Sequence, residues 1–334
     1  MFFNIQALRS VAAIFVLLYH AGPHYNAIIG GESIITKILS WGYVGVDVFF
    51  VISGFVTTLS ITSKRITLDN QFIFLKKRFF RVYLGYVPFF FMMLACIYIT
   101  SPEYITNLSL FNSFFLTTIY MDKLVLPVTW SLSYELYFYL LLSFLFLIRP
   151  KNTTFIFLFL TVLFINVFSE RESIFFMSPF VLEFLFGSLV CIYREKLSNC
   201  NGMVVSCIVI CVLSFLFGMG FKGWNGLVRV STFGVFATAL LLIAILFESK
   251  NMVFNKLLIM LGDSSYTLYL SHLIFLSLFY HTGLRDIISQ QSEIVATLGF
   301  IGYMVFIIIV SHIYSKMIEL PIYRASIKSM RKFQ

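Results

Sequence analysis

Apolar runs long enough to cross a lipid bilayer recur along the whole chain. A hydrocarbon core of about 30 Å requires roughly 17–25 helical residues. Only 12% of the 334 residues are charged and 60% are hydrophobic, too few charges to cover a water-facing surface. The sequence therefore predicts an all-α polytopic integral membrane protein with about ten transmembrane helices. They are expected near residues 5–22, 42–60, 82–100, 131–148, 154–168, 174–193, 203–219, 228–247, 264–280 and 294–314.

The basic residues predict the orientation. With the N-terminus in the cytoplasm, 17 Lys and Arg residues fall in the inner segments and six in the outer ones. This is the bias of the positive-inside rule, and an even number of spans places both termini in the cytoplasm. The net charge of +9 is then mostly topogenic, and no nucleic-acid partner is expected. The long aromatic connection between the third and fourth spans leaves room for a re-entrant or interfacial helix.

The chain shows no internal repeat, low-complexity segment or Pro/Gly/Ser-rich linker. We therefore expect one transmembrane domain over residues 1–334, without a soluble C-terminal domain. The cysteines have no metal-ligand spacing, so we interpret them as small apolar side chains and expect no metal site. They are Cys96, Cys191, Cys200, Cys207 and Cys211.

Ionisable side chains inside a bilayer are costly, so each one is a candidate functional residue. Arg9 and His20 lie at the two ends of the first span. Eleven helical steps bring both side chains to one face, roughly 16 Å apart along the axis. Alternatively, Arg9 extends to the lipid headgroups and His20 caps an interfacial turn before Pro23.

Asp47 lies a turn or two inside the second span, between Gly45 and Gly54, which allow close helix packing. A carboxylate at this depth needs a partner, and His20 or Arg9 of the preceding helix are the candidates. A carboxylate that orients an imidazole is a common way to make a general base. The alternative is an ion pair that only holds helices together.

Basic residues gather before the third span, where Lys77, Arg78 and Arg81 lie three and four positions apart on a helix. Arginine suits bidentate binding of phosphate groups. The alternative is a topogenic role or binding to lipid headgroups.

Further polar residues lie in later spans. Ser131 and Glu135 share a face of the fourth span, and His272 lies in the middle of the ninth, where it is a candidate for the same cavity. Glu183 and His312 are weaker candidates of the same kind.

These residues occur in a series of motifs. Through these motifs the chain resembles the membrane acyltransferase 3 family over nearly its whole length. Within this family, the chain resembles the polysaccharide and O-antigen O-acetyltransferases of bacteria and their serotype-converting phages. In chain order, the motifs are Arg9 with His20, the segment 45–55, Arg78 with Arg81, Trp130 to Tyr139, the segment ending at His272, and Glu319 to Pro321. The chain departs from many members at Leu136, where they have a second acid, and at Ser271, where they have tryptophan.

The resemblance implies transfer of an acetyl group from cytoplasmic acetyl-coenzyme A to a sugar hydroxyl of a lipid-linked glycan, in the bacterial inner membrane. Lys77, Arg78 and Arg81 would bind the donor phosphates, and Arg9 would contact the pantetheine or thioester. His20 would deprotonate the acceptor or carry the acetyl group itself, and Asp47 or Glu135 would orient the imidazole.

A secondary transporter or glycan flippase would use the same acids and histidines as a proton relay. Against it, the two halves of the chain show neither a repeat nor a matching pair of Gly/Pro-broken helices. A non-catalytic membrane scaffold would leave the buried polar residues unexplained.

Overall fold

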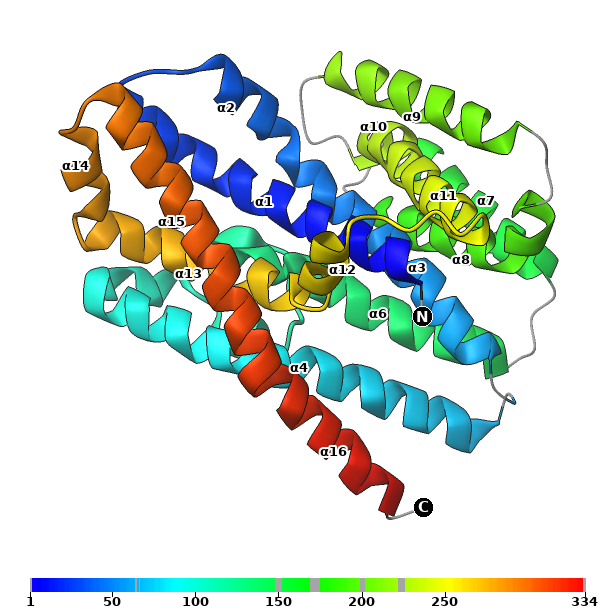
Figure 1. The fold of residues 1–334 in the computed structure, drawn as a ribbon. Helices are drawn as coiled ribbons and strands as arrows, with labels where there is room; N and C mark the ends of the chain where they lie inside the picture. The colour runs from blue at the N-terminus through cyan, green and yellow to red at the C-terminus, as the bar shows by residue number, and fades with distance from the viewer. Residues whose placement is uncertain are drawn as a thin grey trace. The chain divides into compact units, whose positions relative to one another are not determined.

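The computed structural model describes residues 2–63, 65, 67–147, 152–168, 175–198, 202–221 and 226–332 (Figure 1). Helices account for all of its regular elements, and no strand occurs within these ranges. The all-α prediction is therefore confirmed. Some residues used in the charge and cysteine arguments lie outside the described residues, namely Lys64, Arg149, Lys151, Arg171, Cys200 and Lys222.

Every predicted apolar run coincides with a helix of the structure. These helices are α1 (Phe3–Ile29), α3 (Gly45–Thr62), α4 (Leu68–Thr100), α6 (Trp130–Leu147), α7 (Asn152–Phe168), α8 (Phe180–Ser198), α9 (Met203–Met219), α11 (Val235–Ser249), α13 (Ser265–His281) and α15 (Glu293–Tyr314). By length and hydropathy alone, six stretches of the described chain are candidate spans, which lie within 3–29, 34–62, 68–100, 127–147, 226–249 and 293–329. The chain is thus a multi-pass membrane protein, while the count of ten spans and the cytoplasmic termini stay predictions.

Shorter elements connect these helices. Those with α-helical geometry are α2 (Ile34–Leu39), α5 (Leu110–Phe114), α10 (Gly226–Arg229), α12 (Lys256–Gly262), α14 (Leu284–Ser289) and α16 (Leu320–Lys332). Short 3-10 helices are η1 (Ser40–Val44), η2 (Pro102–Asn107), η3 (Met121–Lys123), η4 (Pro127–Thr129) and η5 (Phe175–Met177). Two π-helical turns, η6 (Val230–Gly234) and η7 (Ser315–Glu319), interrupt otherwise α-helical stretches.

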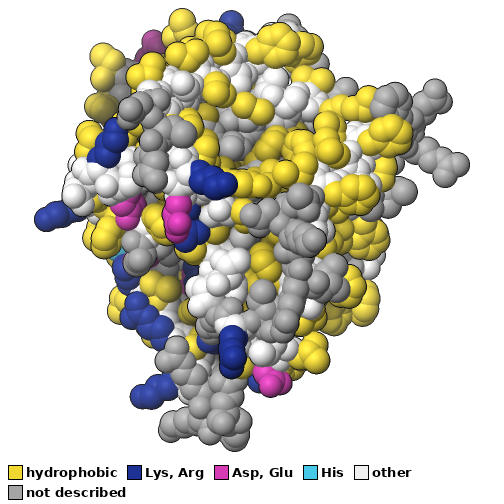
Figure 2. Space-filling model, turned by 90° about the vertical axis from the view of Figure 1, so that its right-hand side faces the viewer, with side chains coloured by type: hydrophobic (Ala, Val, Ile, Leu, Met, Phe, Trp, Pro, Cys, Tyr) yellow, Lys and Arg dark blue, Asp and Glu magenta, His cyan; other side chains and the backbone are white. Residues whose placement is uncertain are grey.

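Apolar side chains cover much of the surface drawn in Figure 2. Large hydrophobic residues are exposed along whole helices, for example Leu298 (63% exposed) on α15 and Leu213 (61%) on α9. Exposed apolar surface of this extent is expected where lipid replaces water as the solvent.

The described helices group into two compact units with interleaved segments. Unit 1 comprises residues 1–9, 46–78 and 134–259, and unit 2 comprises 10–45, 79–133 and 260–334. The chain passes from one unit to the other within continuous helices such as α1 and α4. The expectation of one domain over residues 1–334 stays a prediction.

In unit 1, α11 packs against α8 and α9, and α7 packs against α8. The helices α3 and α8 approach each other through glycine. A Cβ at Gly54 would overlap the backbone of Phe184, and one at Gly187 would overlap the backbone of Val51. The predicted close approach at Gly54 is therefore confirmed, and its partner is α8.

In unit 2, α13 packs against α15, and α1 contacts α15 through a hydrogen bond of 3.1 Å between Tyr25 and Thr297. The connection 101–130 contains the short helices η2, α5, η3 and η4. Tyr86 of α4 donates to the carbonyl of Ser113 at 2.7 Å, and the Ser113 hydroxyl accepts from the amide of Val125 at 2.9 Å. These bonds hold the connection against α4.

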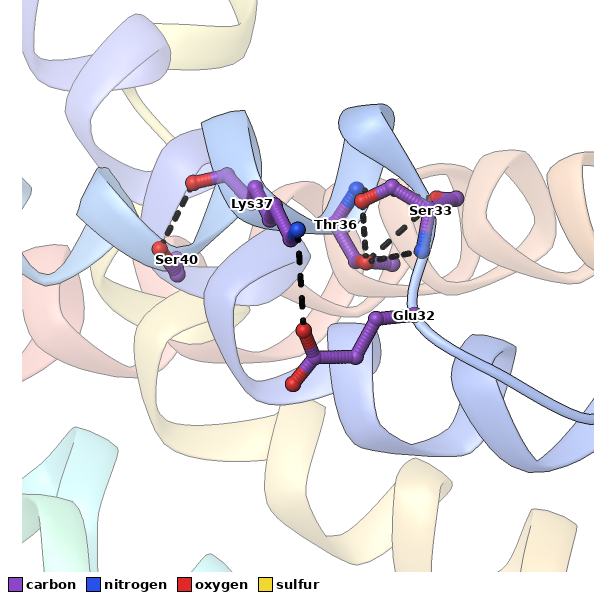
Figure 3. Close-up of polar contacts among 5 residues, drawn as sticks. All are labelled: Glu32, Ser33, Thr36, Lys37 and Ser40. Atoms are coloured by element: carbon purple, nitrogen blue, oxygen red, sulfur yellow. Dashed lines mark hydrogen bonds and ion pairs between the residues drawn. The ribbon is translucent and has the colours of Figure 1, made fainter.

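Also in unit 2, α2 begins with a capping box, in which two residues satisfy each other's backbone amides (Figure 3). The Ser33 hydroxyl accepts from the amide of Thr36, and the Thr36 hydroxyl accepts from the amide of Ser33, each at 3.1 Å. Lys37 and Glu32 form an exposed ion pair at 3.9 Å. A helix of six residues is too short to show periodicity, so α2 could not be predicted from the sequence.

Candidate active site

Two histidines meet in unit 2. His20 of α1 and His272 of α13 are 252 residues apart in the chain, and the Nε2 atom of His272 lies 3.2 Å from the Nδ1 atom of His20. Each Nδ1 atom also lies near a carbonyl oxygen of the preceding helical turn. Nδ1 of His20 lies 2.9 Å from the carbonyl of Val16, and Nδ1 of His272 lies 3.1 Å from the carbonyl of Leu268. His272 is buried, and His20 is half-buried. The structure thus brings together two residues that the sequence singled out separately.

The hydrogen-bond partners define the tautomers of this imidazole pair. A carbonyl only accepts, so Nδ1 of His272 carries a hydrogen and its Nε2, in the neutral ring, is an acceptor. Nδ1 of His20 faces that acceptor as well as the Val16 carbonyl, so it carries a hydrogen too. The lone pair of a neutral His20 then lies on Nε2. His272 therefore orients His20 with its basic nitrogen turned away from the pair.

Ser131 is linked to the same part of unit 2. Its hydroxyl lies 2.9 Å from the Tyr269 hydroxyl, which donates to the carbonyl of Val128 at 2.8 Å. The Tyr269 ring lies beside His272, with 6.0 Å between the ring centroids. Ser131 is buried, and these contacts fix it in the structure.

Glu135 belongs to a polar cluster of unit 1. It accepts hydrogen bonds from the Ser53 hydroxyl at 3.1 Å and from the Tyr139 hydroxyl. The guanidinium of Arg78 lies over the Tyr139 ring, 5.2 Å from its centroid, and donates to the Ser60 hydroxyl at 3.1 Å. The carboxylate of Glu135 is therefore held by two hydroxyl donors.

The partner of Asp47 corrects the sequence analysis. Arg229 binds it in a bidentate pair within unit 1, with Nε–Oδ1 at 2.9 Å and Nη2–Oδ2 at 2.8 Å. Both side chains are almost fully buried. His20 or Arg9 was expected in this place, because each precedes Asp47 closely in the chain. The contacts match the alternative interpretation, an ion pair that holds helices together.

Arg81 also has a carboxylate partner. In unit 2 its Nη1 lies 2.5 Å from Oε1 of Glu319, and the Tyr266 and Tyr323 rings flank its guanidinium. Glu319 is buried and also accepts from the Thr267 hydroxyl. The charge of Arg81 is therefore offset within the protein, which weakens its predicted role in binding phosphate.

The remaining predicted donor-binding residues belong to unit 1. Arg9 lies in α1, as expected, and contacts Gln6 at 3.4 Å. Lys77 precedes Arg78 on α4 and is half-buried. No group of three or more His, Cys, Asp and Glu side chains suited to a metal occurs in the described part of the chain.

Sequence reasoning missed several residues of these clusters. Arg229 lies at the start of the predicted span 228–247 and was counted only among the outer basic residues. Ser53, Tyr139 and Tyr269 carry no charge and lie among many similar residues. Tyr139 follows Glu135 by four residues on one helical face, and this spacing was the available signal for Tyr139. Ser53 and Tyr269 carried no comparable signal.

An imidazole pair and separate buried ion pairs lie in the apolar helices of this membrane protein. Residues 2–316 match the family model Acyl_transf_3, described as an acyltransferase domain. This protein therefore belongs to the acyltransferase 3 family and is a membrane acyltransferase, which confirms the resemblance drawn from the motifs.

A similar curated protein is the peptidoglycan O-acetyltransferase OatA of Listeria monocytogenes, at 30% identity. The similarity covers 41% of this chain and 23% of that relative, so the chain aligns with less than a quarter of the relative's length. No solved structure matches this chain.

Proposed function

We propose that the protein is an O-acetyltransferase of the bacterial inner membrane. It moves an acetyl group from cytoplasmic acetyl-coenzyme A to a sugar hydroxyl of a lipid-linked surface glycan. The observation that supports this proposal most directly is the imidazole pair, because His272 leaves Nε2 of His20 as a base.

The proposed chemistry is a direct acyl transfer. Nε2 of His20 removes the proton of the sugar hydroxyl while the hydroxyl oxygen attacks the carbonyl carbon of the thioester. The carbon–sulfur bond breaks, an ester bond forms, and the imidazolium returns the proton to the leaving thiolate. The products are the acetylated sugar and coenzyme A. His272 is a positioning residue here, since it acts through His20.

For the donor phosphates we propose Arg78 as the principal contact, with Lys77 beside it and Arg9 nearer the thioester. Arg78 forms no ion pair with a carboxylate of the described residues, whereas Arg81 is bound to Glu319. Glu135 is held by Ser53 and Tyr139 in the cluster that includes Arg78. Its proposed role is to position Tyr139 and, through it, the guanidinium.

The acceptor class is a bacterial surface polysaccharide. An O-antigen sugar is our first candidate, from the motif resemblance, and the name of the relative favours peptidoglycan as the second. A mass spectrum of each glycan, from cells with and without the gene, tests the proposal. A mass increase of one acetyl group in either glycan supports acetylation and identifies the acceptor, whereas unchanged spectra of both would count against it.

Replacing Arg78 with lysine is expected to weaken acetyl-coenzyme A binding more than replacing the exposed Lys76 with alanine. A planar guanidinium makes bidentate phosphate contacts and stacks on Tyr139, which an ammonium cannot reproduce. The apparent KM for acetyl-coenzyme A measures the effect. Equal KM values for the two variants would show that Arg78 acts only as a topogenic charge.

The proposed donor side requires that residues 61–81 face the cytoplasm. Thr67 and Gln290 are exposed, and the charge bias places them on opposite sides of the membrane. In a protein without native cysteines, a cysteine replacing Gln290 should react with an impermeant thiol reagent applied to the periplasmic side. One replacing Thr67 should react only after the membrane is opened. Labelling of both from the same side would rule out the cytoplasmic donor path.

A further inference from the structure

A second carboxyl group lies in the cluster of the Asp47–Arg229 pair in unit 1. Glu183 of α8 is fully buried, and its carboxyl interacts electrostatically with both Asp47 and Arg229. Arg229 is bound to Asp47 as an ion pair. Within the described residues, neither oxygen of Glu183 accepts a hydrogen bond. The cluster therefore contains two acids and one guanidinium in a place from which water is excluded.

The surroundings of Glu183 show that its carboxyl is held in place. Gly234 ends the π-helical turn η6 that follows Arg229, and a Cβ there would lie 3.1 Å from Cγ and 3.2 Å from Oε1 of Glu183. Any larger residue would press on the carboxyl. π-helical turns within α-helices are often found at functional sites. Here Arg229, just before the turn, binds Asp47, and Gly234, at its end, contacts Glu183 without a side chain of its own.

The charge balance of the cluster determines its protonation. Asp47 and Arg229 neutralise each other through two hydrogen bonds. A second ionised carboxylate would leave a net negative charge in a buried site, at a cost of several kcal/mol or more. Two carboxylates also cannot hydrogen bond to each other, since both only accept. A proton on Glu183 removes the excess charge and supplies the missing donor.

We propose that Glu183, Asp47 and Arg229 form a buried proton-binding site, in which neutral Glu183 donates its O–H to the Asp47 carboxylate. The Asp47 carboxylate then accepts hydrogen bonds from Glu183 of α8 and from Arg229 of α10. The site joins α3, α8 and α10 within unit 1 without net charge. Its existence does not depend on the proposed acetyl transfer.

Infrared spectroscopy of the purified protein in lipid nanodiscs tests the proposal. The wild-type protein at neutral pH should show the carbonyl stretching band of a protonated carboxylic acid. Glu183→Gln should lose this band, because its amide retains the donor without an acid. The matched control is Glu195→Gln on the same helix, where the side chain is 86% exposed, and it should keep the band.

A second measurement needs no variant and so does not depend on the folding of Glu183→Gln. Glutamate labelled with carbon-13 at its carboxyl should shift the band in the wild-type protein, whereas labelled aspartate should leave it in place. Persistence of the whole band in folded Glu183→Gln, or a band that only labelled aspartate shifts, would overturn the proposal. Absence of any such band from the wild-type protein would overturn it as well.

Discussion

Replacing His20 with alanine is expected to lower the rate of acetyl transfer by about 10²–10⁴-fold, the usual contribution of a general base. His20 is the member of the imidazole pair whose Nε2 remains available as a base. The side chain is only half-buried, so its loss should leave membrane insertion intact. Release of coenzyme A in the presence of glycan measures the rate.

The matched control is His281→Ala, since His281 is an exposed histidine at the end of α13. It should retain the wild-type rate. At position 272, glutamine should retain more activity than alanine, because its side-chain oxygen can accept from Nδ1 of His20 as the imidazole does. A normally inserted His20→Ala protein with full activity would exclude His20 as the base.

Replacing Arg81 with alanine is expected to destabilise the protein by about 3–5 kcal/mol, the usual cost of leaving one member of a buried ion pair without its partner. The side chain of Glu319 is 1% exposed, and Arg81 is the cation bound to it. Thermal unfolding in detergent, followed by the loss of the monomer peak in size-exclusion chromatography, measures the effect.

A second substitution separates charge from packing. Glu319→Gln in the Arg81→Ala background removes the uncompensated carboxylate and should recover part of the lost stability. The control is Lys316→Ala, since Lys316 forms a more exposed pair with Asp263 at 2.8 Å, and such pairs contribute about 0–1 kcal/mol. Equal destabilisation by Arg81→Ala and Lys316→Ala would show that burial of Glu319 has no energetic consequence.

The helices could be predicted because hydropathy is a local property of the chain. Each apolar run, from α1 to α15, is long enough for its composition alone to indicate a helix. The segment α2 and the connection 101–130 were not predicted in detail, since helices of three to six residues have no measurable period. Their conformation depends on caps and tertiary bonds, such as the capping box at Ser33 and the bond from Tyr86 to Ser113.

The ionisable residues of the site could be predicted, but most of their partners could not. Charge inside an apolar run singled out His20, Asp47 and Glu135 from sequence. The pair of Asp47 with Arg229 spans 182 residues, and no periodicity connects the two positions. The sequence favoured neighbours in the chain as partners, whereas helix packing within each unit selects partners from distant segments.

Acetyl transfer by the purified protein in lipid nanodiscs tests the central claim most directly. The reaction contains acetyl-coenzyme A with a radiolabelled acetyl group and a lipid-linked glycan. We predict that label appears on the glycan as an alkali-labile ester, with one free thiol of coenzyme A per ester, and that His20→Ala forms both products about 10²–10⁴-fold more slowly. The opposite result is an intact thioester, together with movement of the glycan across the membrane when the same purified protein is reconstituted in proteoliposomes. That result would contradict acyl transfer and identify a flippase instead.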